Sequence, residues 1–368
     1  MQHSLDRTLL ILTITLVSIG FLIFSSASLG LLAREGARFS SVALNQILFG
    51  IVGGSIALFI TSTIHYRWWR QYAFYIFLAM LLLTLCVFIP GIGFSHGGAR
   101  RWISIGSFSM QPAELLKIAF TIYMATWLSG MKQHVADFKK GTLPFVLFVA
   151  GIGVPLLLQP DTDTYLVMAA ASVAMFITAG GRVRDVCVMV LSGVLLLAVL
   201  AFTRPYIKDR IETFINPASD PQGSGYQIKQ SLIAVGSGGF LGRGFGQSIQ
   251  KFEYLPEPIG DSIFAVYAEE FGFICSIVLI LLFSGFGLRG YKIASQAPDL
   301  FGMLLVVGII TIIILQAILN IAAMLAVAPL SGLPLPFISH GGTALFITLA
   351  SVGILLNVSK YQKATLTP

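Results

Sequence analysis

Charged residues are scarce in this sequence: aspartate, glutamate, lysine and arginine together make up 11% of its 368 residues. Because a soluble domain carries roughly 25%, this composition excludes an ordinary soluble enzyme or binding module. Cysteine is scarcer still, with three residues in all. Each stands in or beside an apolar segment without metal-ligand spacing, so we interpret the cysteines as packing residues rather than as disulfides or metal ligands.

Nucleotide-binding motifs are absent as well. In the glycine-rich stretch 236–247, the last glycine of a dinucleotide fingerprint falls on Leu241 or on Gln247, depending on where the motif is started. No P-loop lysine follows this stretch. We therefore expect no nucleotide cofactor, and we expect these glycines to serve tight turns and close backbone approach. A nucleic-acid partner is not expected either.

Long apolar runs, in contrast, recur along the whole chain, and hydrophobic residues make up 56% of it. A helix needs roughly 20 residues to cross the bilayer core, and a spanning segment must satisfy its own backbone hydrogen bonds. We therefore predict an all-α polytopic membrane protein with ten transmembrane helices, at 8–32, 42–62, 71–90, 113–130, 143–158, 165–179, 186–203, 263–288, 301–327 and 343–358.

The distribution of lysine and arginine predicts the orientation of this bundle. If both termini are cytoplasmic, the inner segments hold most of the cations near the helix ends, as the positive-inside rule requires. The long stretch 204–262, between the seventh and eighth helices, then faces outward. The first apolar run is too long for a removable signal peptide. We predict a single membrane domain over 1–368, with short helices at 206–216 and 226–235 in the outer stretch and a glycine-broken loop at 91–114.

Asp261 is the acid that joins the outer stretch to the eighth helix. One interpretation makes it a catalytic base, and the other makes it an ordinary helix-opening residue whose charge suits the helix dipole. Glu269 lies eight residues on, roughly on the same helical face, and Glu270 points about half a turn away. Buried acids in membrane helices are functional by default; alternatively, these two brace loops or pair with Lys117.

Three further pairs of charged residues stand in the predicted outer loops or at the helix ends beside them. Glu114 and Lys117 share a helix face, as a structural ion pair or as a cavity-lining pair that also touches an anionic substrate. Adjacent Arg100 and Arg101 either contact lipid headgroups or clamp a pyrophosphate, for which guanidinium is well shaped. Asp161 and Asp163 could bind a divalent cation, but no third ligand stands nearby. His340 is a single histidine without a sequence partner.

Six stretches, in order along nearly the whole chain, resemble the SEDS family (shape, elongation, division and sporulation), which includes FtsW, RodA and SpoVE. The similarity is greatest to the FtsW branch, chiefly through the first and fifth of the stretches. Two residues depart from the family pattern: Asp163 stands where glycine is usual, and His340 where tyrosine is usual. The six stretches are GARRW at 98–102, QPAELLK at 111–117, QPD at 159–161, GSGYQIKQSLIAVGSGG at 223–239, YLPEPIGDSIFAVYAEE at 254–270 and PLPFISHGG at 334–342.

The resemblance implies a glycosyltransferase of the bacterial plasma membrane, at the division septum, that polymerises lipid II into peptidoglycan. It also implies a class B penicillin-binding protein and divisome proteins as partners. The family's essential aspartate falls on Asp261, and its sensitive acid and lysine fall on Glu114 and Lys117. Asp261 would accept a proton from the acceptor's sugar hydroxyl. Alternatives are a RodA-like elongation polymerase, a lipid II flippase and a non-enzymatic scaffold. The expected pyrophosphate ligands, aided by Mg²⁺ or Mn²⁺, are Arg100, Arg101, Lys117, Arg243 and Lys251.

Overall fold

The computed structural model describes residues 4–34, 36–96, 99–105 and 108–362, and each predicted apolar run is helical over nearly its whole length. Shorter helices connect them, and α9 (Pro205–Ile215) and α10 (Ser224–Ser237) confirm the two helices predicted in the outer stretch. The ten runs correspond to α1 (Arg7–Arg34), η1 (Asn45–Gly53) continued by α3 (Gly54–Thr63), α4 (Tyr66–Leu85), α5 (Pro112–Gly130), α6 (Leu143–Leu158), α7 (Thr162–Thr178), α8 (Val183–Thr203), α12 (Ile263–Ser295), α13 (Leu300–Met324) and α14 (Gly342–Ser359).

Among the described residues, eight helical segments are long and apolar enough to cross a membrane. The other two predicted spans are α5, which carries Glu114 and Lys117 in its first two turns, and α7, which has 17 residues. A polytopic helical membrane protein is therefore confirmed. The count of ten spans stays a prediction.

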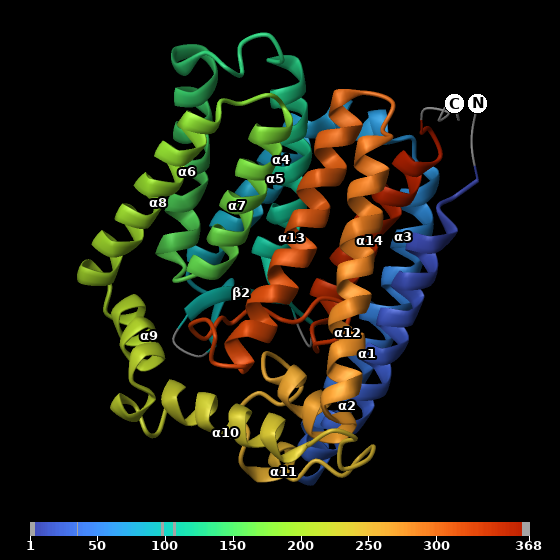
Figure 1. Cartoon of the computed structure of the whole chain (residues 1–368), viewed down its shortest axis with the longest axis vertical. Helices are drawn as coiled ribbons and strands as arrows, with labels where there is room; N and C mark the ends of the chain where they lie inside the picture. Colours follow the sequence, from blue (N-terminus) through green and yellow to red (C-terminus); the bar gives the residue numbers. More distant parts are fainter. Residues whose placement is uncertain (1–3, 35, 97–98, 106–107, 363–368) are drawn as a thin grey trace.

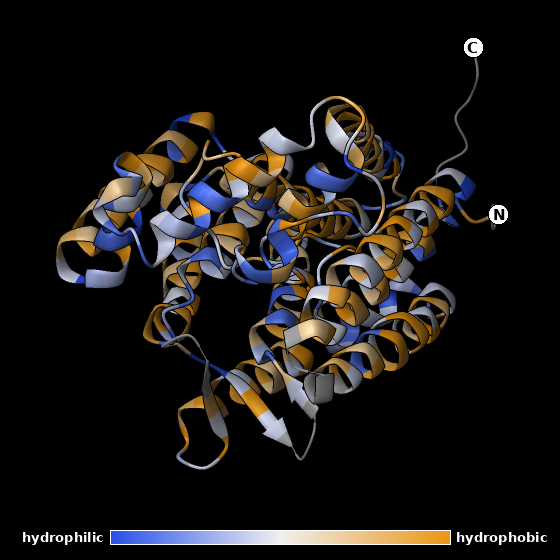
Figure 2. Ribbon diagram, turned by 90° about the horizontal axis from the view of Figure 1, so that it is seen from below, coloured by the Kyte–Doolittle hydropathy of each residue, from blue (hydrophilic) through white to orange (hydrophobic). Residues whose placement is uncertain are grey.

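The helices form one bundle with two distinct ends. α1 begins and α14 ends at the same end, while α9, α10 and α11 (Gln250–Glu253) lie at the opposite end, which we call the loop end (Figure 1). Viewed from the loop end, hydrophilic segments gather near the middle and the peripheral helices are mainly hydrophobic (Figure 2). A polar site at the loop end can therefore stand against a hydrophobic bundle.

Helix α13 is the centre of this bundle and α8 is its least covered member. α13 packs against α5, α7 and α12, and 67% of its apolar window is buried. None of the corresponding window of α8 is buried. Such a helix is stable only where its apolar side chains meet lipid or another protein.

The stretch 91–114, predicted as a loop, contains an antiparallel sheet. Its strands are β1 (Gly93–His96), β2 (Ala99–Ile105) and β3 (Phe108–Met110), in the order β1-β2-β3. The prediction was wrong because the glycines were taken to prevent regular pairing, whereas the alternating side chains of β2 suit a strand with two different faces. This sheet lies at the loop end beside the lower turns of the bundle (Figure 1).

The predicted eighth helix is broken at Gly272, where φ is 75°. A Cβ at this position would lie 2.3 Å from the backbone N of Gly242, so only glycine fits. The glycine-rich stretch lies directly on the break: Arg243 N donates to Glu269 O at 3.0 Å, and Phe273 N donates to Gly239 O at 2.9 Å. The close backbone approach predicted for these glycines is confirmed, and 263–271 forms a separate segment of α12 at the loop end.

Candidate active site at the loop end

Asp261 lies in a tight turn just before α12, whose N-cap is the next residue, Ser262. The turn is made by Glu257, which has a φ of 45° and whose carbonyl accepts from Gly260 N at 3.0 Å and from Ser262 N at 3.2 Å. A non-glycine residue in this region of φ is strained. The surrounding structure must therefore hold the turn in place.

Three elements supply that support. Asn320 of α13 is fully buried, and its amide donates to the carbonyl of Asp261 at 2.9 Å and to that of Leu333 at 2.8 Å. Ser339 Oγ donates to Gly260 O at 2.7 Å. Gln227 of α10 donates to Ser262 Oγ at 3.0 Å. The backbone on both sides of Asp261 is thus fixed by hydrogen bonds, while its carboxylate forms no hydrogen bond or ion pair with a described residue.

Two arginines approach this free carboxylate from different elements. A Cβ built on Gly332 would lie 3.7 Å from Asp261 Oδ2, 3.9 Å from Arg101 Nη1 and 4.0 Å from Arg210 Nη2. The turn before α12, strand β2 and helix α9 therefore converge on one point above Gly332. We call Asp261, Arg101, Arg210 and Gly332 the convergence site. A small residue at Gly332 leaves space there for a ligand atom.

Burial governs the protonation of the carboxylate. It raises the pKa of Asp261 to about 7, the negative charges of Glu257 and Asp163 act in the same direction, and Arg210 and Arg101 oppose them. A carboxyl group of this kind exchanges protons near neutral pH, as general-base catalysis requires.

Two of the predicted site residues, Arg101 and Asp161, lie together in the structure. Arg101 Nη1 lies 3.5 Å from Asp161 Oδ1, and its guanidinium also donates to the carbonyls of Gln159 and Pro160. Gln111 donates to Asp161 Oδ2 at 3.1 Å. Burial raises the pKa of Asp161, and the charge of Arg101 opposes this rise. Asp161 thus orients Arg101 toward the convergence site.

Arg100 does not join Arg101 there. Neighbouring side chains on a strand point to opposite faces, and Arg100 Nε donates to Gly93 O of β1 at 3.3 Å. Arg100 and Arg101 therefore point to opposite faces of β2 and cannot form the predicted double-arginine clamp together. This separation was not predicted because the stretch was expected to be a loop. Gly98, the first residue of this sequence motif, lies outside the described residues.

Glu114 and Lys117 form a buried ion pair that is linked to the loop 328–341, which contains Gly332. Lys117 Nζ lies 2.8 Å from Glu114 Oε1, and both residues are buried. Lys117 also donates to Gln316 Oε1 at 3.0 Å, and Gln316 donates to Pro334 O at 2.9 Å. The pair therefore supports the loop 328–341. Sequence reasoning missed Gln316 and Asn320, although two polar residues four apart in an otherwise apolar α13 are a recognisable signal.

Lys251, Glu269 and Glu270 form a different cluster, which no contact among the described residues joins to Asp261. Lys251 Nζ lies 2.7 Å from Glu270 Oε1, and both side chains are fully buried. Ser26 of α1 donates to both oxygens of Glu270, at 2.6 and 2.7 Å. Because the ammonium group of Lys251 is fully buried and paired with Glu270, it is not accessible to a pyrophosphate. The structure therefore gives no support to the predicted role of Lys251 as a pyrophosphate ligand.

The neighbouring acid has a similar structural role. Glu269 accepts from Ser248 Oγ at 2.5 Å and from Ile249 N at 3.1 Å, and Arg243 Nε lies 3.5 Å from it. The two acids therefore brace the outer stretch, the alternative foreseen for them. Their predicted pairing with Lys117 is wrong, because Lys117 pairs with Glu114. Glu269 and Glu270 both precede the break at Gly272, so they lie in the short segment 263–271 at the loop end.

Asp163 and His340 also have defined contacts. Asp163 lies 2.6 Å from Arg210 Nη1 and accepts from Gly332 N at 3.2 Å. His340 donates its backbone N–H to Ile259 O at 2.7 Å, and its ring stacks on Phe24 with centroids 5.9 Å apart. His340 therefore contacts the turn that holds Asp261, and Asp163 contacts two other residues of the convergence site.

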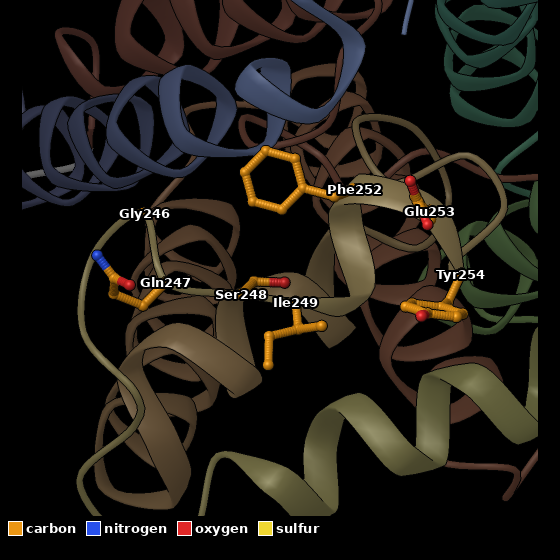
Figure 3. A pocket seen from close by; sticks show the side chains of 7 residues that line it. All are labelled: Gly246, Gln247, Ser248, Ile249, Phe252, Glu253 and Tyr254. Atoms are coloured by element: carbon orange, nitrogen blue, oxygen red, sulfur yellow. The ribbon is translucent and has the colours of Figure 1, made fainter. Parts of the chain in front are cut away.

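A divalent cation does not fit the acids of this region. Asp161 and Asp163 each face an arginine, and within the described ranges no group of three His, Cys, Asp or Glu side chains is arranged to hold a metal ion. A pocket of about 330 Å³ lies elsewhere at the loop end, lined by residues 246–249 and 252–254 (Figure 3).

The chain matches known proteins over nearly its whole length. A family model described as cell cycle protein, FtsW/RodA/SpoVE, matches residues 6–364. Stage V sporulation protein E of Bacillus subtilis is 39% identical over 98% of this chain and 99% of its own length. The probable peptidoglycan glycosyltransferase FtsW of Geobacter metallireducens is 39% identical over 98% of this chain and 96% of its own.

Solved structures agree with this match. One is a chain from a study of how a peptidoglycan synthase complex coordinates polymerization and crosslinking; it is 26% identical, with a TM-score of 0.77, over 98% of this chain and 99% of that one. Another is the rod shape determining protein RodA of Thermus thermophilus, 25% identical with a TM-score of 0.71 over 98% of both chains.

Proposed function

The chain belongs to the FtsW/RodA/SpoVE family of cell cycle proteins, and from this membership we propose that it is a peptidoglycan glycosyltransferase that polymerises lipid II, with Asp261 as the general base. The observation that carries the proposal is the convergence of a free carboxylate with Arg101 and Arg210 at the loop end. A base and two cations beside one open point are what transfer of a sugar from a pyrophosphate requires.

In the proposed reaction, the sugar 4-hydroxyl of the acceptor lipid II gives its proton to the Asp261 carboxylate. The hydroxyl oxygen forms a bond to the anomeric carbon of the donor, and the bond to undecaprenyl pyrophosphate breaks with inversion. The pyrophosphate leaves with the electron pair, and Arg101 stabilises its charge. Asp161 keeps that guanidinium in place through the contact of 3.5 Å.

The location and partners belong to the same proposal. The loop end would face the outside of the bacterial plasma membrane, with both termini in the cytoplasm, because the cationic residues favour that orientation. A class B penicillin-binding protein would crosslink the strands beside it; the similarity to a peptidoglycan synthase complex supports such a partner. The similarity to FtsW supports action at the division septum with divisome proteins.

Purified protein incubated with lipid II in detergent tests the activity. We expect glycan polymer, because polymerisation needs no separate compartments, whereas flipping does. Polymer that forms only after a class B penicillin-binding protein is added identifies a partner-activated enzyme. Absence of polymer under both conditions contradicts the proposal and favours the flippase or scaffold.

The pH dependence of the rate is a second prediction. Because the pKa of Asp261 is raised to about 7, its basic form is lost as the pH falls through that value. We expect the polymerisation rate to be about tenfold lower at pH 6 than at its plateau above pH 8. The measurement is initial rate against pH at saturating lipid II. A rate that is unchanged down to pH 5 would contradict a base with this pKa.

A further inference from the structure

Arg210 is the residue of the convergence site that sequence reasoning did not identify. It stands on α9, in the outer stretch, and its Nη1 is engaged by Asp163 at 2.6 Å. Its Nη2 forms no hydrogen bond with a described residue and lies 4.0 Å from the point above Gly332. A guanidinium has donors on both η nitrogens, so one side of this group is anchored and the other side remains available to a ligand.

Asp163 anchors Arg210 and connects it to a second element of the site. Its Oδ2 accepts from Arg210 and also from Gly332 N at 3.2 Å, so one carboxylate oxygen joins α9 to the loop 328–341. A second contact between α7 and α9, the hydrogen bond of Thr162 with Tyr206, lies one helical turn before Arg210. Helix α9 is therefore held against the start of α7 by two polar contacts on the same face.

The two arginines reach the convergence site from different elements, Arg101 from β2 and Arg210 from α9, and each is paired with an aspartate. Arg101 is backed by Asp161 at 3.5 Å, and Arg210 by Asp163. Both arginines are partly covered, with side-chain exposures of 14% and 28%. Charge-assisted hydrogen bonds are stronger in such surroundings than at a fully exposed surface. Two separately anchored guanidinium groups offer donors to two phosphate groups, as a pyrophosphate requires.

We propose that Arg210 is a second anion-binding residue of the active site, in addition to Arg101, that contacts the pyrophosphate of the lipid-linked substrate, and that Asp163 is the positioning residue that holds it there. This inference rests on the proposed function for the identity of the ligand. The position of Arg210 follows from its own contacts and does not depend on the identity of the ligand.

Steady-state kinetics of Arg210→Ala test the binding role. We expect the KM for lipid II to rise about tenfold, because one charge-assisted contact is lost, while kcat changes much less. The matched control is Lys208→Ala, which removes an exposed cation that lies on the same helix and lines a different pocket, at the junction of α8 and α9. An unchanged KM in Arg210→Ala, or an equal loss in both variants, overturns the proposal.

The pH profile distinguishes an electrostatic role from a merely structural one. The charged groups that act on Asp261 are Glu257, Asp163, Arg210 and Arg101. Removing the negative charge with Asp163→Asn should lower the pKa of Asp261, and removing the positive charge with Arg210→Ala should raise it. We expect the acid limb of the profile to move in opposite directions in the two variants. Loss of packing would not produce opposite shifts, so shifts of the same sign overturn the assignment of Asp163.

A binding measurement separates this proposal from the proposed function. The purified protein is titrated with undecaprenyl pyrophosphate and, as an uncharged control, with undecaprenol. We expect Arg210→Ala to weaken binding of the pyrophosphate about tenfold and to leave binding of the alcohol unchanged. If the wild type binds pyrophosphate through Arg210 but forms no polymer, the proposed function fails and the anion site stands. If both lipids bind equally to both proteins, the anion site fails.

Discussion

Asp261→Asn should lower lipid II polymerisation at least about 100-fold, the lower range for removal of a general base. Asparagine fills the same volume but accepts no proton, and the hydrogen bond of Asn320 to the backbone carbonyl of residue 261 is unaffected by the change. We therefore expect the fold and the binding of lipid II to be retained while turnover is lost. The measurement is glycan product per unit time under conditions that saturate the wild type.

The matched control is Asp209→Asn, which removes an exposed carboxylate next to Arg210. It should keep nearly the full rate. Equal melting temperatures of the two variants in detergent would show that neither change unfolds the protein. Polymerisation by Asp261→Asn within a few-fold of the wild type would remove the base assignment, and an equal loss in both variants would point to general electrostatics of the outer stretch.

Lys251→Met should produce the largest loss of stability, of about 3–5 kcal/mol, because it leaves Glu270 as an uncompensated buried charge. Lys251 and Glu270 are fully buried and 2.7 Å apart, and Ser26 connects them to α1. Thermal unfolding in detergent is the measurement. The same substitution at exposed Lys229 on α10 is the control and should leave the melting temperature nearly unchanged.

A double variant sharpens this second test. Lys251→Met combined with Glu270→Gln removes both charges, so it should be more stable than Lys251→Met alone. Additive losses would show that the two side chains do not depend on one another. Equal melting temperatures for Lys251→Met and Lys229→Met would contradict the structural role of the buried pair.

The helices were predictable from the sequence because apolar runs of spanning length have few alternatives in lipid. The break at Gly272 was not, because glycine is common within membrane helices and its partner, Gly242, lies far back in the sequence. The same limit applies to Lys251: its cationic side chain suggested a ligand site, but its partners Ser26 and Glu270 come from other elements. Burial of a lysine depends on tertiary packing, which spacing in the sequence does not contain.

The candidate site was predictable in part. Asp261, Asp161 and Arg101 were identified as site residues, and the structure brings Asp161 and Arg101 together. Arg210 was missed because α9 is an amphipathic surface helix in the sequence, and nothing local indicates that one of its cations faces a buried acid. The separation of Arg100 from Arg101 could be predicted only if β2 had been recognised as a strand, because adjacent side chains along a strand point to opposite faces of the sheet.

The exposed apolar surface of α8 should make the activity of this protein sensitive to the surrounding lipid or detergent. α8 ends at Thr203 and α9 begins at Pro205, so only one residue links α8 to the helix that carries Arg210. With no buried window of its own, α8 takes its tilt from the surrounding solvent, whether acyl chains or a micelle. Turnover should therefore vary with bilayer thickness and detergent chain length, and preparations in different amphiphiles are not interchangeable.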